Sequence, residues 1–223
     1  MIDAQGRIQA VLEQLVSEGR EVGLQVAAYL DGELVVDAWA GAADRATGHD
    51  VDGDSLFPLH SCGKGVTATA IHLLADRGLF EYDMPVATVW PEFACHGKQR
   101  VTLRQVLNHS AGVPHLPADT TPGDLCDWDR MCAVITESAP LWEAGTRVGY
   151  HALTYGYILG EAVRRADGRT VDQVVRDEIT GPLGIADSPI YGIAESMAPR
   201  VAVVVDDAPE NPTCPELRRR WPR

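Results

Sequence analysis

The strongest limit on the fold is the order of two kinds of sequence pattern along the chain. In LQVAAYLDGELVVDAWAG, two segments rich in strand-forming residues flank Asp31-Gly32, a dipeptide that favours a tight hairpin turn. From Ser61 onward, apolar residues recur instead at helical spacing. Because strands and helices do not alternate, this order predicts an α+β fold rather than a doubly wound parallel sheet.

Helices are expected on both sides of the hairpin. One is predicted over the first ~18 residues, where Ile8 and Leu12 lie on one apolar face. Four more are predicted in SCGKGVTATAIHLLADRG, VTLRQVLNHSAGVP, LTYGYILGEAVRRADG and TVDQVVRDEITGPLG. A hairpin alone is unstable in water, and residues 201–205 are the one candidate for a further strand. We expect a domain over residues 8–205 and an irregular basic tail over residues 206–223.

The composition limits the classes of binding partner and the cellular compartment that suit this chain. The 19 Lys and Arg against 32 Asp and Glu give a net charge of −13, which disfavours binding to nucleic acid. No stretch approaches the ~18 apolar residues of a membrane span, and the N-terminus lacks the apolar core of a secretory signal. Five cysteines at irregular spacing favour reduced thiols over a disulfide framework, which predicts a cytoplasmic protein.

The segment HSCGKG places a lysine, Lys64, three residues after Ser61. On a helix these residues share a face, so the amine can reach the hydroxyl. The positive end of the helix dipole disfavours an ammonium there, and a neutral amine is the base that a serine nucleophile needs. The same helix end offers N–H groups to an oxyanion. The alternative is a serine N-cap beside a solvated lysine, because Ser-x-x-Lys arises by chance about once in a chain of this length.

Other ligand classes do not fit the spacing of the motifs. A phosphate-binding loop around GKGVT would need a glycine and a hydroxyl residue where Pro58 and Gly65 stand. Asp50, Asp52 and Asp54 lack the glycine position and the glutamate of a calcium loop. The chain has no H-E-x-x-H or paired C-x-x-C pattern for zinc. We therefore expect no metal and no cofactor.

Three segments around Ser61 resemble the serine β-lactamase-like superfamily, in the same order. They are LFPLHSCGKGVTATAIHLLADRGLFEYDMPVATVWPEF, VTLRQVLNHSAGVP, and WEAGTRVGYHALTYGYILGEAVRRADGRTVDQVVRDEITGPLGI. This superfamily includes class C β-lactamases, penicillin-binding DD-peptidases and the related family VIII carboxylesterases. The resemblance spans residues 8–205. It implies a β-lactamase/transpeptidase-like fold, in which helices flank an antiparallel sheet beside a mostly helical subdomain.

The resemblance also implies roles for particular residues. Ser61 would be the acylated nucleophile, Lys64 its base, and Tyr150, in GYHALTYG, the catalytic tyrosine. A tyrosine beside a lysine ammonium is drawn toward phenolate and can pass a proton to the leaving group. The alternative for Tyr150 is a half-buried packing residue.

The two residues after Tyr150 bear on the substrate. β-Lactamases and DD-peptidases usually place Asn or Ser two residues beyond this tyrosine to hold a substrate amide. Ala152 stands there and offers no polar group, which favours an ester substrate over a β-lactam. His151 and Ala152 are the candidate substrate-binding residues, although a histidine beside a motif is more often structural.

A third family motif is not found in the sequence. In the family, Lys-Thr-Gly, His-x-Gly or Trp-x-Gly on a later strand supplies an oxyanion N–H. Beyond Tyr150 the chain has no lysine and only His151 as histidine, and Trp221 is followed by Pro. We therefore expect the C-terminal strands to be missing, which would expose a sheet edge open to self-association. A truncated or frame-shifted product, a deliberate fragment, and a short form completed by another chain are the alternatives, and the ending LRRRWPR favours a shifted frame.

Three functions remain open from the sequence. The first is a serine hydrolase that cleaves small esters through an acyl-enzyme on Ser61. The second is an acyltransferase, or a β-lactamase or DD-peptidase-like enzyme, with the same nucleophile. The third is a truncated, catalytically impaired remnant.

Overall fold

The computed structural model describes residues 3–186 and 191–205 of the 223-residue chain. The chain divides into two compact units, one formed by Met1–Pro58 with Ile193–Arg223 and the other by Leu59–Gly192. The basic tail expected over residues 206–223 lies outside the described residues. Within the described ranges, no helix is both long and apolar enough to cross a membrane.

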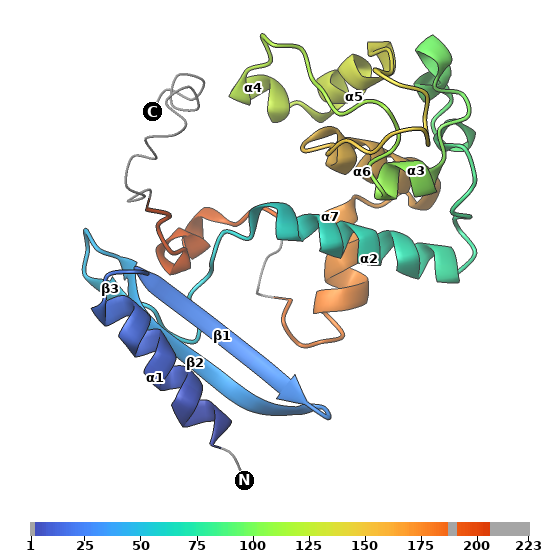
Figure 1. Cartoon of the computed structure of the whole chain (residues 1–223). Coiled ribbons are helices and arrows are strands. Elements are labelled where there is room, and N and C mark those ends of the chain that lie inside the picture. The colour runs from blue at the N-terminus through green and yellow to red at the C-terminus, as the bar shows by residue number, and fades with distance from the viewer. Residues whose placement is uncertain (1–2, 187–190, 206–223) are drawn as a thin grey trace. The chain divides into compact units, whose positions relative to one another are not determined.

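The first unit contains a helix that packs along a β-hairpin (Figure 1). This helix, α1 (Ala4–Ser17), begins at Asp3, whose carboxylate accepts the N–H of Gly6 at 2.8 Å. Its apolar face buries Leu12 against Val36 of the hairpin. The helix expected over the first ~18 residues is therefore confirmed.

The hairpin consists of β1 (Gly23–Leu30) and β2 (Glu33–Asp44), which pair antiparallel. Asp31 and Gly32 join them with φ angles of 52° and 83°, the left-handed values that a tight hairpin turn requires. A short strand, β3 (His49–Asp50), pairs with β2, so the sheet order is β1-β2-β3. The predicted hairpin is confirmed.

The strand predicted over residues 201–205 is wrong. Val201 forms an isolated parallel bridge with Leu56, whereas the N–H of Val203 donates to the carbonyl of Ala43 at 2.7 Å. Because neighbouring residues pair with two different segments, no ladder builds up with either of them. A 3-10 helix, η5 (Glu195–Arg200), precedes this segment.

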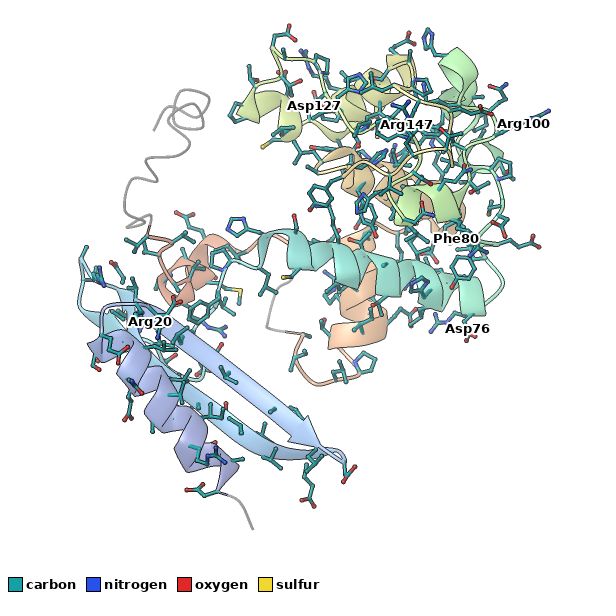
Figure 2. All side chains as sticks on the ribbon, in the orientation of Figure 1. Arg20, Asp76, Phe80, Arg100, Asp127 and Arg147 are labelled. Atoms are coloured by element: carbon teal, nitrogen blue, oxygen red, sulfur yellow. The ribbon has the colours of Figure 1, made fainter. Side chains whose placement is uncertain are left out.

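The second unit is helical and encloses a larger apolar core, with its side chains crowded around α3, α5 and α6 (Figure 2). Its α-helices are α2 (Gly63–Asp76), α3 (Leu103–Leu107), α4 (Pro122–Leu125), α5 (Trp128–Glu137), α6 (Thr154–Asp167) and α7 (Val171–Val175). Shorter elements are the 3-10 helices η1 (His60–Cys62), η2 (Val86–Thr88) and η3 (Pro91–Gly97) and the π-helical turn η4 (Arg176–Thr180). Ile158, Leu159 and Ala162 of α6 are fully buried in this core. The helix α6 also packs against α2, α3 and α5, so it forms the centre of the unit.

Helix ends in this unit follow signals in the sequence. The helix α6 ends at Gly168, which has a φ of 86°, and Gly78, with a φ of 79°, follows α2. A capping box of Thr102 and Gln105 starts α3. Two α-helices were not predicted, because both are short: α4 has four residues, and α5 has ten. The helix α5 begins at Asp127, labelled in Figure 2, whose carboxylate accepts the N–H of Arg130 at 3.0 Å.

A buried carboxylate links α5 to α6. Glu161 is fully buried and accepts the indole N–H of Trp128 at 2.8 Å, together with hydrogen bonds from Arg164 at 2.7 Å and Arg165 at 2.6 Å. Burial alone would raise the pKa of Glu161, but the bonds from Arg164, Arg165 and Trp128 lower it to about 2. The charge is thus compensated within the unit, and the Trp128 ring is held against α6.

Candidate active site

The nucleophile candidate lies in a tight turn that leads directly into a helix. Ser61 is in the 3-10 helix His60–Cys62, and Lys64 is the second residue of α2, which follows without a break. The Nζ of Lys64 donates a hydrogen bond to the Oγ of Ser61 at 3.1 Å. His60, just before Ser61, has a φ of 45°, a left-handed conformation that is rare outside glycine and recurs at functional sites.

The backbone of this turn uses most of its own N–H groups. The N–H of Cys62 donates to the carbonyl of Leu59 at 3.0 Å, and the N–H of Gly63 donates to the carbonyl of His60. The expectation that several N–H groups of this helix end face an oxyanion is therefore too broad. Among the first residues of the turn, the N–H of Ser61 itself is the remaining candidate.

Tyr150 reaches the same hydroxyl from the loop before α6. Its Oη donates to the Oγ of Ser61 at 2.6 Å, and the Nζ of Lys64 lies 4.9 Å from the centre of its ring. Hydrogen bonds with Lys64 and Ser61 lower the pKa of the Tyr150 hydroxyl. The structure thus brings together Ser61, Lys64 and Tyr150, which are separated by up to 89 residues in the sequence.

His151 lies next to this group but faces inward. Its ring is fully buried; Nε2 accepts the N–H of Val113 at 3.1 Å, and Nδ1 contacts the carbonyl of Gly149 at 2.6 Å. Because both ring nitrogens are bonded to the main chain, neither is available to a substrate. The structure therefore favours the structural alternative for His151 over substrate contact. Ala152, which follows it, is exposed.

A second histidine connects this loop to the tyrosine. His109 has a φ of 62°, and its Nδ1 accepts the N–H of His151 at 3.1 Å while its carbonyl accepts the N–H of Gly149 at 3.0 Å. Its ring centre lies 4.9 Å from that of Tyr150 and 5.0 Å from that of Tyr155. The two histidines together fix the backbone on both sides of Tyr150.

Both histidines are held neutral. Burial lowers the pKa of His109, with a further contribution from the positive charge of Lys64. Burial also lowers the pKa of His151. The geometry requires the same state, because Nδ1 of His109 and Nε2 of His151 each accept a backbone N–H and must therefore lack a proton.

Two further tyrosines contact the backbone of the Ser61 turn. Tyr155 is buried, its hydroxyl donates to the carbonyl of Lys64 at 3.4 Å, and burial raises its pKa to about 12. The hydroxyl of Tyr191 donates to the carbonyl of Gly63 at 3.0 Å and lies 2.7 Å from the hydroxyl of Thr67. Sequence reasoning missed Tyr191, because it follows α7 in an irregular segment where no periodicity or motif marks it.

The described residues contain no cluster of three or more His, Cys, Asp or Glu side chains that could hold a metal ion. Cys62 is a free and exposed thiol beside the nucleophile candidate. The groups that meet at the candidate site are the Ser61 hydroxyl, the Lys64 amine and the Tyr150 phenol, and both of the latter are hydrogen-bonded to Ser61.

Comparisons with known proteins identify the family of the chain. A family model described as Beta-lactamase matches residues 8–222. The esterase/beta-lactamase LipL of Mycobacterium tuberculosis is 41% identical over 161 residues, which make up 72% of this chain and 37% of that protein. Esterase EstB of Burkholderia gladioli is 30% identical over 92% of this chain and 56% of its own length.

Solved structures give the same assignment. The crystal structure of a family VIII carboxylesterase has a TM-score of 0.84 at 34% identity, covering 92% of this chain and 56% of that one. A penicillin-binding protein homolog from Caulobacter crescentus has a TM-score of 0.83 at 40% identity, covering 92% and 54%. The chain thus spans between 37% and 56% of the length of these four relatives.

The predicted fold class is confirmed by these comparisons: the fold is α+β and β-lactamase/transpeptidase-like. The family match extends over nearly the whole chain, and it includes Ser61, Lys64 and Tyr150. The chain therefore belongs to the beta-lactamase family.

Proposed function

We propose that this protein is a serine hydrolase of the carboxylesterase type, which cleaves small esters through an acyl-enzyme on Ser61. One observation carries the proposal: the Oγ of Ser61 lies 3.1 Å from the Nζ of Lys64 and 2.6 Å from the Oη of Tyr150. A serine is a weak nucleophile until a neighbouring base takes its proton, and here two candidate bases touch it.

The proposed reaction begins with loss of the Ser61 proton. The lowered pKa of Tyr150, with the Lys64 amine close by, favours a phenolate that accepts this proton. The Ser61 oxygen then attacks the ester carbonyl carbon, and the carbonyl oxygen takes up the negative charge of the tetrahedral intermediate. When the C–O bond to the alcohol breaks, Tyr150 returns its proton to the leaving oxygen. Water attacks the acyl-enzyme in the same way and releases the acid.

The side chain of Ala152 favours an ester substrate over a β-lactam or a peptide substrate. Its exposed methyl group offers no hydrogen bond to a substrate amide, two residues beyond Tyr150. A site without this partner discriminates against substrates that need one, whereas an ester makes no such demand. The esterases among the relatives support the same choice.

The proposal is tested by covalent labelling. A fluorophosphonate probe should label the folded wild-type chain, and the label should be lost in Ser61→Ala but kept in Ser17→Ala, which alters an exposed serine on α1. Hydrolysis of p-nitrophenyl butyrate should follow the same pattern. Absence of label on wild-type protein with a folded circular dichroism spectrum would contradict the proposal. Product analysis with an added alcohol separates hydrolysis from acyl transfer.

We also propose that the protein acts in the cytoplasm. The four cysteines in the described part of the chain are all free thiols, which supports a reducing compartment. Fractionation of cells that express the chain with its native flanking sequence tests this, and recovery of the protein outside the cytoplasm would contradict it.

A further inference from the structure

A cavity runs along one face of α6 in the second unit, and its volume is about 380 Å³. We call it the α6 cavity. Ligand cavities in proteins typically measure about 300–1,000 Å³, so this one suits a small ligand or a single chain. Its lining includes Gly156, Tyr157 and Gly160, which share one face of α6, and Leu153, which directly precedes this helix. Trp128 of α5 also lines it.

Polar side chains also line the cavity, among them Arg164, Thr170 and Asp172. Arg164 is paired with the buried Glu161 at 2.7 Å, and other polar groups of the lining have partners as well. The indole N–H of Trp128 donates to Glu161 at 2.8 Å, and the hydroxyl of Tyr157 donates to the carbonyl of Leu125 at 2.6 Å. The hydroxyls of Thr67 and Tyr191 bond to each other at 2.7 Å. A polar ligand would find these donors already used, whereas an apolar ligand gains by leaving water.

Two residues of the cavity lining lie close to the candidate active site. Tyr191 lines the cavity, and its hydroxyl contacts the carbonyl of Gly63, the second residue after Ser61. Thr67 also lines it and lies one turn beyond Lys64 on α2, about 4.5 Å along the helix axis.

A third lining residue, Leu153, lies directly before α6 and close to Tyr150 in the sequence. It lines the cavity three residues after Tyr150, so their Cα atoms are at most about 11 Å apart. Lining residues of the cavity therefore neighbour both the Ser61 turn, through Tyr191, and Tyr150, through Leu153, which places the cavity close to a chain attached to Ser61.

Two glycines on α6 shape the open space. A Cβ on Gly160 would lie 2.5 Å from Cη2 of Trp128, so the indole ring lies directly against the helix backbone there. A Cβ on Gly156 would meet no atom within 4 Å, so the cavity is open at that point. Gly156 lines the cavity and accepts a Cβ without a clash, so it is the position at which we introduce a longer side chain.

We propose that the α6 cavity binds the acyl chain of the ester and sets a preference for chains longer than butyrate. This inference rests on the proposed esterase function. The acyl group stays attached to Ser61 through acylation and deacylation, so a cavity that holds it acts on both steps. The apolar side chains of the lining, together with the indole and tyrosine hydroxyl groups that already have partners, fit an alkyl chain.

The test is a chain-length profile with p-nitrophenyl acetate, butyrate and octanoate, which share one leaving group. Wild type should give the highest kcat/KM with octanoate. Gly156→Leu should lower kcat/KM for octanoate by at least about 10-fold while leaving acetate within about two-fold, since a single methylene in an apolar pocket is worth 10-fold or more. An unchanged ratio of octanoate to acetate in Gly156→Leu would overturn the proposal.

Two matched variants control for folding and helix propensity. Gly156→Ala changes the same helical position with a short side chain and should retain most of the octanoate preference. Gly123→Leu makes the same substitution at an exposed glycine of α4 that does not line the cavity, and it should leave the profile unchanged. Loss of octanoate preference in Gly123→Leu equal to that in Gly156→Leu would overturn the assignment to the cavity.

A binding measurement separates this inference from the esterase proposal. In Ser61→Ala, octanoate should raise the Tm more than acetate does at equal concentration, and Gly156→Leu should abolish the difference. If no ester is hydrolysed but this protection occurs, the esterase function fails and the binding of alkyl chains stands. If esters are hydrolysed but octanoate gives no protection, the cavity assignment fails.

Discussion

Each of the two units of the chain is stabilised internally in a different way. In the first unit, α1 and the hairpin bury a small set of side chains, with Leu12 at 5% and Val36 at 4% exposure. Large apolar residues of the hairpin remain exposed to solvent: Tyr29 is 69% exposed and Leu30 is 63% exposed. In the second unit, α6 is surrounded by packed neighbours, and Ile158 and Leu159 are fully buried.

This difference separates structure that short-range sequence signals specify from structure that depends on contacts between residues far apart in the sequence. The first unit is specified by short-range signals, a capped helix and a two-residue turn, and it carries little core. The second unit depends on contacts between distant segments, including the buried Glu161 that joins α5 to α6 and the histidines that hold the Tyr150 loop. The candidate site lies in the unit whose packing can hold side chains in fixed positions.

The largest expected effect comes from truncating the core of the second unit. Leu159→Ala should cost about 2–5 kcal/mol of stability, because the surrounding helices cannot close the space that it leaves. Leu12→Ala in the first unit should cost less, about 2 kcal/mol or below, since the thin layer around it can relax. Urea unfolding followed by circular dichroism measures both. Equal losses would show that the two cores are comparable.

The second-largest expected effect is a difference between the two units in how much stability each loses at acidic pH. His109 and His151 are neutral in the folded chain, and their pKa values are lowered by burial, below about 6.5. As the pH falls through about 6.5, the unfolded chain binds protons that the folded chain excludes, so stability of the second unit falls. In the first unit, hydrogen bonds from side-chain and backbone groups lower the pKa of Asp44 and Asp52, so their contribution is lost only at lower pH.

The charged and titratable groups around the two rings are Lys64, Tyr150 and Tyr155 together with the histidines themselves. Urea midpoints between pH 8 and pH 5 measure the slope for wild type and for His151→Gln. The variant should be less stable at pH 8, where it loses the buried ring, and should show a flatter slope. An equally steep slope in His151→Gln would assign the acid sensitivity to other groups.

Much of the fold could be predicted because its signals are local. The Asp31-Gly32 turn, the glycine after α6 and the capping box of α3 each act within a few residues. The failure over residues 201–205 has a physical cause. An apolar run rich in valine favours a strand, but a strand needs a continuous partner, and here the backbone divides its bonds between Leu56 and Ala43.

The candidate site likewise combines features that local sequence spacing predicts with features that it does not. The spacing of Ser61 and Lys64 is a property of one helical turn, and the sequence therefore contains it. Tyr150 was predicted through family resemblance and not through spacing, since 89 residues separate it from Ser61. Tyr191, 128 residues from Gly63, had no local signal. The inward orientation of His151 depends on the buried N–H of Val113, which sequence alone does not place.

The smallest expected effect tests the local character of the first unit. Gly32 has a φ of 83°, and a Cβ there would meet no atom within 4 Å. Gly32→Ala should therefore cost about 1 kcal/mol, and the cost should come entirely from the left-handed backbone, which alanine adopts poorly. Gly123→Ala, at a glycine without a positive φ, is the control and should be neutral or slightly stabilising. If Gly32→Ala costs as little as the control, the turn does not determine the hairpin, and the first unit depends on its thin core after all.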